Sequence, residues 1–167
     1  GNLPEVGSTV KTFELIDEEL KTKSNQDFSS KKKVFNIFPS IDTGVCAASA
    51  RKFNEEAAKY KDAVVINVSR DLPFALKRFC AAEGLDNVVS LSDFRGTFGE
   101  DYGVTIKDSP MQGLLSKEYA RHRASQINPE KNNAFASPGD PYPYEGKSNP
   151  YLNLLQKRAA LTDTSLQ

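Results

Sequence analysis

Two short apolar runs stand out in the pattern of hydrophobic and polar positions along the chain, and each contains a single asparagine. They are Val34 to Phe38, with Asn36, and Ala63 to Val68, with Asn67. Nearly continuous apolar runs of this length are typical of strands buried on both faces of a parallel sheet. We therefore expect two strands of this buried parallel type.

The segment between these runs has helical spacing. Its apolar positions recur at offsets of four, three, four and three, as on one face of a helix; they are Cys46, Ala50, Phe53, Ala57 and Tyr60. Thr43 is a suitable N-cap, because its hydroxyl can accept a hydrogen bond from an unpaired amide of the first turn. A helix from Gly44 to Tyr60 between two buried strands makes a βαβ unit.

Further alternation follows the second run. We expect a helix capped by Asp71, with Pro73 in its first turn and Gly84 at its end. Its expected apolar face consists of Leu72, Leu76 and Phe79, with Cys80 beside them. Next we expect a short strand from Val88 to Leu91. It is followed by a helical or turn segment from Phe94 to Val104, which ends at Gly103. One further strand is expected earlier, around Val10, Phe13, Leu15 and Ile16. Alternating strands and helices indicate an α/β fold.

Composition narrows the class of protein. A chain of 167 residues fits one domain. The 22 basic residues equal the 22 acidic ones, so no overall charge attracts nucleic acid or a membrane surface. No apolar run approaches the roughly 18 to 20 residues of a membrane helix. Two cysteines and one histidine are too few for a Cys/His zinc site, and we expect no metal and no cofactor.

Two cysteines are enough for one disulfide. In the cytosol such a disulfide is usually transient and catalytic rather than a permanent cross-link. No signal-peptide pattern opens the sequence, and we expect a cytoplasmic protein; the periplasm is the alternative if an N-terminal signal has been removed.

Cys46 falls in the first turn of the expected helix. The positive end of the helix dipole and free N–H groups both favour its thiolate over its thiol, which would make it a nucleophile. The alternative is a buried structural cysteine that packs as a small hydrophobic residue. The surrounding residues decide between the two.

The run P-S-I-D-T-G-V-C, from Pro39 through Thr43 to Cys46, resembles the P-x-x-x-T-x-x-C signature of the peroxiredoxins. The wider N-I-F-P-S-I-D-T-G-V-C-A-A-S resembles their thiol peroxidase branch, the atypical two-cysteine enzymes. This resemblance covers residues 1–115 and implies a thioredoxin-like fold, with a central mixed sheet flanked by helices. It also implies that Cys46 is the peroxidatic cysteine, that Thr43 binds the thiolate and the peroxide, and that Pro39 shields the sulfur from water.

Cys80 lies in R-F-C-A-A-E-G-L, which resembles the resolving segment of the same branch. The resemblance implies a Cys46–Cys80 disulfide after each turnover; the alternative is a core cysteine in an amphipathic helix. The two Cα atoms of a disulfide must come within roughly 4.4 to 6.8 Å of each other. We expect the first turn at Cys46 and the end of the Cys80 helix to unwind locally to achieve this.

The sequence departs from the family pattern after Leu115. Alignment places Lys117 where the family carries an arginine that pairs with the thiolate, and Arg121 or Arg123 could serve instead; all three could equally be surface residues. We expect His122 to be exposed. Residues 116–150 hold five prolines between 129 and 150, which predicts a divergent, irregular segment. We expect this segment to be part of a single domain spanning residues 1–167.

The resemblance implies a thiol-dependent peroxidase that reduces hydrogen peroxide and alkyl hydroperoxides, is recycled by thioredoxin and forms a homodimer, with the residues 42–45 near the interface. One alternative is a catalytically impaired thioredoxin-fold binding or chaperone module, suggested by the altered arginine position. Another is a dithiol oxidoreductase without specificity for peroxides.

Overall fold

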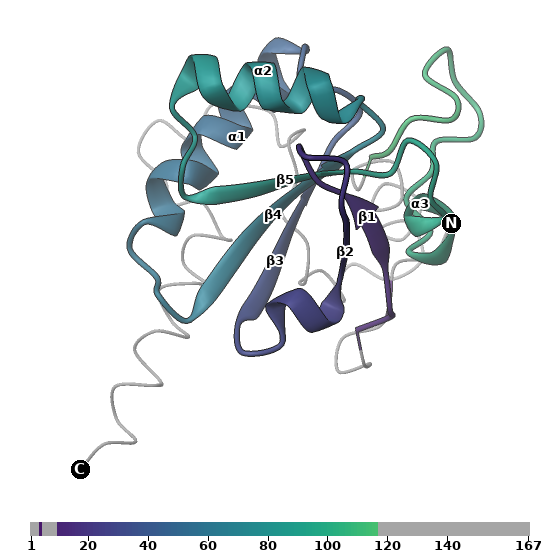
Figure 1. Ribbon diagram of the computed structural model, residues 1–167. Coiled ribbons are helices and arrows are strands. Elements are labelled where there is room, and N and C mark those ends of the chain that lie inside the picture. Colours follow the sequence, from purple (N-terminus) through teal and green to yellow (C-terminus); the bar gives the residue numbers. More distant parts are fainter. Residues whose placement is uncertain (1–3, 5–9, 117–167) are drawn as a thin grey trace, which may run out of the picture.

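The computed structural model describes residue 4 and residues 10–116. These residues form a mixed five-stranded sheet in the order β2-β1-β5-β4-β3 (Figure 1). The elements, in chain order, are β1 (Glu14–Ile16), β2 (Thr22–Ser24), the 3-10 helix η1 (Asn25–Phe28), β3 (Lys32–Ile37), α1 (Gly44–Ala57), β4 (Ala63–Ser69), α2 (Pro73–Glu83), β5 (Val88–Ser92) and α3 (Phe98–Asp101). No helix in this part of the chain is long and apolar enough to cross a membrane.

Strands β3, β4 and β5 are parallel, as the two buried runs predict. Strand β3 pairs with β4, with Asn36 opposite Asn67, and β4 pairs with β5, with Asn67 opposite Ser90. Strand β1 joins the other side of β5 in antiparallel orientation, so the sheet is mixed as expected. The α/β fold predicted from the sequence is therefore confirmed.

Each face of the sheet has its own core. Helices α1 and α2 lie together over one face (Figure 1), where Ala50 of α1 and Leu76 of α2 belong to one buried cluster that includes both cysteines. The other face packs against aromatic rings, with Phe98 stacked on Tyr102 at 4.3 Å between ring centroids. Alternate residues of β3, β4 and β5 therefore enter different cores, because successive side chains of a strand point to opposite faces of the sheet.

The N-terminal region holds more structure than expected. The predicted strand is β1, but a second strand, β2, pairs with it to form a hairpin. The carboxylate of Asp17 organises the turn by accepting hydrogen bonds from the amides of Glu19 and Lys21. Strand β2 reads T-K-S and lies at the edge of the sheet among the described residues, so it lacks the apolar pattern that would have revealed it.

The ends of the two large helices differ from the prediction in part. Helix α1 begins after the Thr43 cap, as expected, but it ends at Ala57 rather than Tyr60. The amide of Tyr60 bonds to the carbonyl of Ala57, three residues back, which is a turn rather than a continued helix. Gly84 ends α2 in the left-handed conformation at a φ of 63°, as predicted.

The prediction that Asp71 caps α2 is wrong. Leu72 occupies the N-cap position without a side-chain cap, and its own side chain is 53% exposed rather than on the apolar face. Asp71 does not cap the helix because its carboxylate binds groups from other segments, which belong to the site described next.

Candidate active site

Cys46 lies in the first turn of α1, where the sequence places it. The Thr43 hydroxyl accepts a hydrogen bond from the Cys46 amide at 3.3 Å and donates one to the Ser40 carbonyl at 3.2 Å. Thr43 therefore caps the helix and closes the loop that follows β3. Pro39, the second residue of that loop, is half-buried.

The Cys46 side chain is only 4% exposed. This burial raises the pKa of its thiol, and the negative charge of Asp71 acts in the same direction. Hydrogen bonds from the Thr43 hydroxyl and from the backbone amides of Ser40 and Cys46 lower the pKa, but by less. The expectation of a thiolate favoured by the helix N-terminus is thus wrong for this conformation, because loss of hydration outweighs the nearby donors.

Asp71 fixes the loop that carries Pro39 and Thr43. Its Oδ1 accepts the Ser40 hydroxyl, while its Oδ2 accepts the Ile41 amide and the Ser69 hydroxyl, all at 2.7 Å. Ser92 donates in turn to the Asp71 carbonyl. The ends of β4 and β5 thereby hold the β3–α1 loop in position.

Sequence reasoning missed this role of Asp71. The available signal was its place two residues after a buried parallel strand, since functional groups gather at the carboxyl ends of such strands.

Cys80 lies near the end of α2 and is also buried, at 9% exposed. Its Sγ lies 3.2 Å from the Ser90 hydroxyl on β5. Burial raises the pKa of Cys80 to about 11; the Ser90 hydroxyl lowers it, and the carboxylate of Glu18, in the β1–β2 turn, raises it. In this conformation Cys80 is a protonated thiol at neutral pH.

The structure brings the two cysteines into one buried cluster of side chains, and both are free thiols. The salt bridge from Arg51 of α1 to Glu83 of α2, at 2.7 Å, joins the two helices that carry them. A second one, from Arg78 of α2 to Asp42 of the motif loop at 3.2 Å, lies at the surface.

The predicted thiolate-pairing cations Lys117 and Arg121, with Arg123, lie outside the described residues. Arg70 follows β4 directly, but its guanidinium binds Glu100 and the Gly113 carbonyl and pairs with Asp93. It therefore serves the loops around α3.

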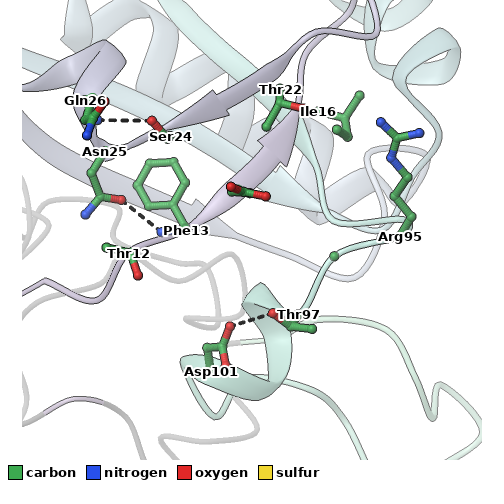
Figure 2. A pocket seen from close by; sticks show the side chains of 12 residues that line it. Thr12, Phe13, Ile16, Thr22, Ser24, Asn25, Gln26, Arg95, Thr97 and Asp101 are labelled. Carbon is green, nitrogen blue, oxygen red and sulfur yellow. Dashed lines mark hydrogen bonds between the residues drawn. The ribbon is translucent and has the colours of Figure 1, made fainter.

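A cleft of about 700 Å³ lies on another part of the surface (Figure 2). It is formed by the N-terminal hairpin and η1, which contribute Phe13 and Asn25, and by α3 and the loop before it, which contribute Arg95, Thr97 and Asp101. Neither cysteine lines it, so it does not contain the predicted chemistry.

Comparisons with known proteins show the family to which the chain belongs. The Redoxin family model matches residues 5–121. The chain is 54% identical to the thiol peroxidase of Corynebacterium glutamicum over 117 residues, which are 70% of this chain and 71% of that protein. It is 55% identical to the thiol peroxidase of Mycobacterium tuberculosis over 117 residues, 70% of each chain.

Solved structures give the same result. The peroxiredoxin-like protein from Aquifex aeolicus superposes with a TM-score of 0.64 at 36% identity, covering 70% of this chain and 68% of that one. The thiol peroxidase from Chromobacterium violaceum superposes with a TM-score of 0.63 at 27% identity, with the same coverage. The chain therefore belongs to the Redoxin family and, within it, to the thiol peroxidases. The predicted thioredoxin-like fold and enzyme class are confirmed.

Proposed function

We propose that this chain reduces hydrogen peroxide and alkyl hydroperoxides, with Cys46 as the attacking thiol and Cys80 as the resolving thiol. The observation that carries the proposal is the local geometry at Cys46: a cysteine in the first turn of a helix, capped by Thr43, in a loop fixed by Asp71. The membership of the thiol peroxidases supports the same reaction.

In the first step the Cys46 thiolate attacks one oxygen of the peroxide. An S–O bond forms as the O–O bond breaks, so the sulfur is oxidised to a sulfenic acid and the other oxygen leaves as hydroxide or alkoxide, which takes up a proton. The Thr43 hydroxyl and the Ser40 and Cys46 amides near the sulfur are suited to stabilise negative charge as the O–O bond breaks.

Cys46 must first lose its proton, which burial opposes in this conformation. We propose that a cation from the segment after Leu115, Lys117 or Arg121, completes the site and favours the thiolate. Opposite charge within a few ångströms lowers a thiol pKa. Arginine would do so through a rigid fork of donors and lysine as a point charge, so the two are not equivalent.

In the second step Cys80 attacks the sulfenic sulfur of Cys46. The S–S bond forms, the S–O bond breaks, and hydroxide leaves with the proton of Cys80 as water. Each thiol sits in a regular helix and is buried, so we propose that both helix ends open locally before they join.

A dithiol protein of the thioredoxin type would then reduce the disulfide by exchange. We propose further that the chain forms a homodimer through the surface beside the motif. Val45 is 54% exposed and Phe74, at the start of α2, is 62% exposed, and apolar side chains of this size are typical of interface cores. Sedimentation of the protein and of a Val45→Glu variant tests this.

Peroxide consumption by single-cysteine variants tests the function. One equivalent of hydrogen peroxide should be consumed by the reduced protein with loss of both thiols, and by Cys80→Ser with loss of one. Cys46→Ser should leave the peroxide and Cys80 intact. If both variants consume peroxide alike, the division of roles is wrong; if the native protein leaves both thiols titratable, the binding-module alternative holds instead.

A further inference from the structure

A row of polar side chains crosses the sheet beneath α1 and α2. Asn36 of β3, Asn67 of β4 and Ser90 of β5 are direct neighbours in the strand register. They are all essentially inaccessible to solvent, at 0%, 1% and 4% exposed. These are the polar residues that interrupt otherwise apolar strands, and the reaction described above does not use them.

The row is hydrogen-bonded from end to end. Asn36 Nδ2 donates to Asn67 Oδ1 at 2.8 Å, and Asn67 Nδ2 donates to the Ser90 hydroxyl oxygen at 3.3 Å. At the β3 end the hydroxyl of Ser49, on α1, donates to Asn36 Oδ1 at 3.3 Å. At the β5 end Ser90 meets Cys80 Sγ at 3.2 Å. The row therefore joins one helix to the other.

Ser90 is the link between this row and Cys80. Its hydroxyl oxygen accepts from Asn67 Nδ2 and lies 3.2 Å from Cys80 Sγ, and either the hydroxyl or the thiol can donate in that contact. The Cys80 thiol can direct its own hydrogen to the Glu18 carboxylate, which also faces it. The contact with Asn67 therefore keeps the Ser90 hydroxyl beside the sulfur.

We propose that Ser90 is a positioning residue that retains Cys80 inside the closed α2 helix and so slows disulfide formation with Cys46. This inference rests on the proposed function, in which Cys80 must leave its place to reach Cys46. Opening the end of α2 separates Cys80 from Ser90, so the hydrogen bond between them is lost on the way to the disulfide. A longer-lived sulfenic acid at Cys46 is the consequence.

The environment of Cys80 agrees with a holding role. In the closed helix the pKa of Cys80 is about 11, with burial as the main cause and the Glu18 carboxylate adding to it. The closed thiol is therefore protonated and a poor nucleophile at neutral pH. Opening the end of α2 moves the Cys80 sulfur and also exposes it to water. An interaction that stabilises the closed helix therefore delays disulfide formation and not the reaction with peroxide.

Rapid mixing followed by acid quench and mass spectrometry separates the two steps, because the sulfenic acid and the disulfide differ in mass. In Ser90→Ala we expect the peroxide step to keep its native rate. Disulfide formation should become about two- to ten-fold faster, which is the effect of losing one hydrogen bond that favours the closed form. With excess peroxide, the variant should also form less sulfinic acid at Cys46, because its sulfenic acid is consumed sooner.

A second pair of variants covers the case in which Ser90→Ala folds poorly. Ser90→Thr and Ser90→Val have the same shape and suit a strand equally, but only threonine keeps the hydroxyl. We expect valine to form the disulfide about two- to ten-fold faster than threonine. Equal rates, or a slower valine variant, would overturn the inference.

Ser49→Ala is the matched control, because it removes a hydroxyl from the other end of the row and leaves the Ser90–Cys80 contact in place. We expect it to form the disulfide at the native rate. If disulfide formation in Ser49→Ala is accelerated as much as in Ser90→Ala, a general loosening of the packing beneath the two helices explains the effect, and the proposed role of Ser90 is wrong. If the native protein forms neither sulfenic acid nor disulfide, the proposed function fails and this inference fails with it. If the native protein forms the disulfide and the Ser90 variants form it at the same rate, only this inference is refuted.

Discussion

The Asp71 carboxylate accepts a hydrogen bond from the Ile41 amide at 2.7 Å, which ties the loop before Cys46 to the end of β4. Thirty positions separate the two residues in the sequence. Burial is the main cause of the raised pKa of the Cys46 thiol, and the charge that holds this loop adds to it. One residue therefore supports the geometry of the site and opposes ionisation of its sulfur.

Asp71→Asn should separate these two effects. Asparagine keeps an oxygen for the Ile41 amide and an NH₂ group for the Ser40 hydroxyl, but it removes the negative charge. Without that charge the Cys46 thiolate is less disfavoured, so the thiol pKa should fall. Titration of thiolate absorbance in a Cys80→Ser background measures it, and an unchanged or higher pKa would contradict this prediction.

Asp71→Ala should instead disrupt the loop. It leaves the Ile41 amide and two serine hydroxyls without their acceptor, and a hydrogen bond to a charged group contributes roughly 1.5–3 kcal/mol. We expect a loss of about 2–4 kcal/mol in the free energy of unfolding and slower peroxide reduction than in Asp71→Asn. Urea unfolding measures the first effect. A variant as stable as the native protein would show that the loop does not depend on Asp71.

Thr43→Val should weaken the start of α1. The substitution preserves shape but removes the hydroxyl that accepts from the Cys46 amide and donates to the Ser40 carbonyl. Loss of a threonine cap costs about 1 kcal/mol, and peroxide reduction should slow further because the Thr43 hydroxyl, which lowers the pKa of the Cys46 thiol, is lost. Thr43→Ser is the control, since it keeps the hydroxyl and should stay close to native in both measurements.

Alkaline pH should destabilise the reduced protein in part through Cys80. Burial, aided by the Glu18 carboxylate, raises its pKa to about 11 in the folded state, above the value of roughly 8.5 for a free cysteine. The folded state holds this proton more tightly, so its contribution to stability is complete below pH 8.5 and is lost as the pH rises towards 11. The difference in urea midpoint between the native protein and Cys80→Ser should therefore shrink across this range. A constant difference would contradict the raised pKa.

Oxidation should change amide exchange at two places. If the disulfide requires both helix ends to open, the oxidised protein should lose protection in the first turn of α1 and the last turn of α2 relative to the reduced protein. Strand β4, between them, serves as the internal reference and should keep its protection. Equal protection in both forms would mean that the two thiols join without local unwinding.

Local signals predicted much of the fold. The buried strands follow from apolar runs, the start of α1 from Thr43, and the end of α2 from Gly84, because each depends on residues close by in the chain. Strand β2 was missed because the edge residues T-K-S have no apolar pattern. Asp71 was misread as a cap because its true partner Ile41 is brought to it only by the parallel pairing of β3 with β4.

The chemistry of the site was predicted less completely than its residues. The motif located Cys46 and Thr43, but the direction of the Cys46 pKa depends on how deeply the thiol is buried, which the sequence does not give. The role of Asn36 and Asn67 was likewise hidden, because two isolated asparagines form a row with Ser90 only once the register of three strands is known.

The central claim is that Cys46 is oxidised first and Cys80 then resolves it, and peptide mapping after one equivalent of hydrogen peroxide tests it most directly. We expect one intramolecular disulfide joining the peptides of Cys46 and Cys80 in the native protein. We expect a sulfenic acid, trapped by dimedone, on Cys46 in Cys80→Ser and none on Cys80 in Cys46→Ser. Dimedone on Cys80, or two unmodified thiols in the native protein, would contradict the account.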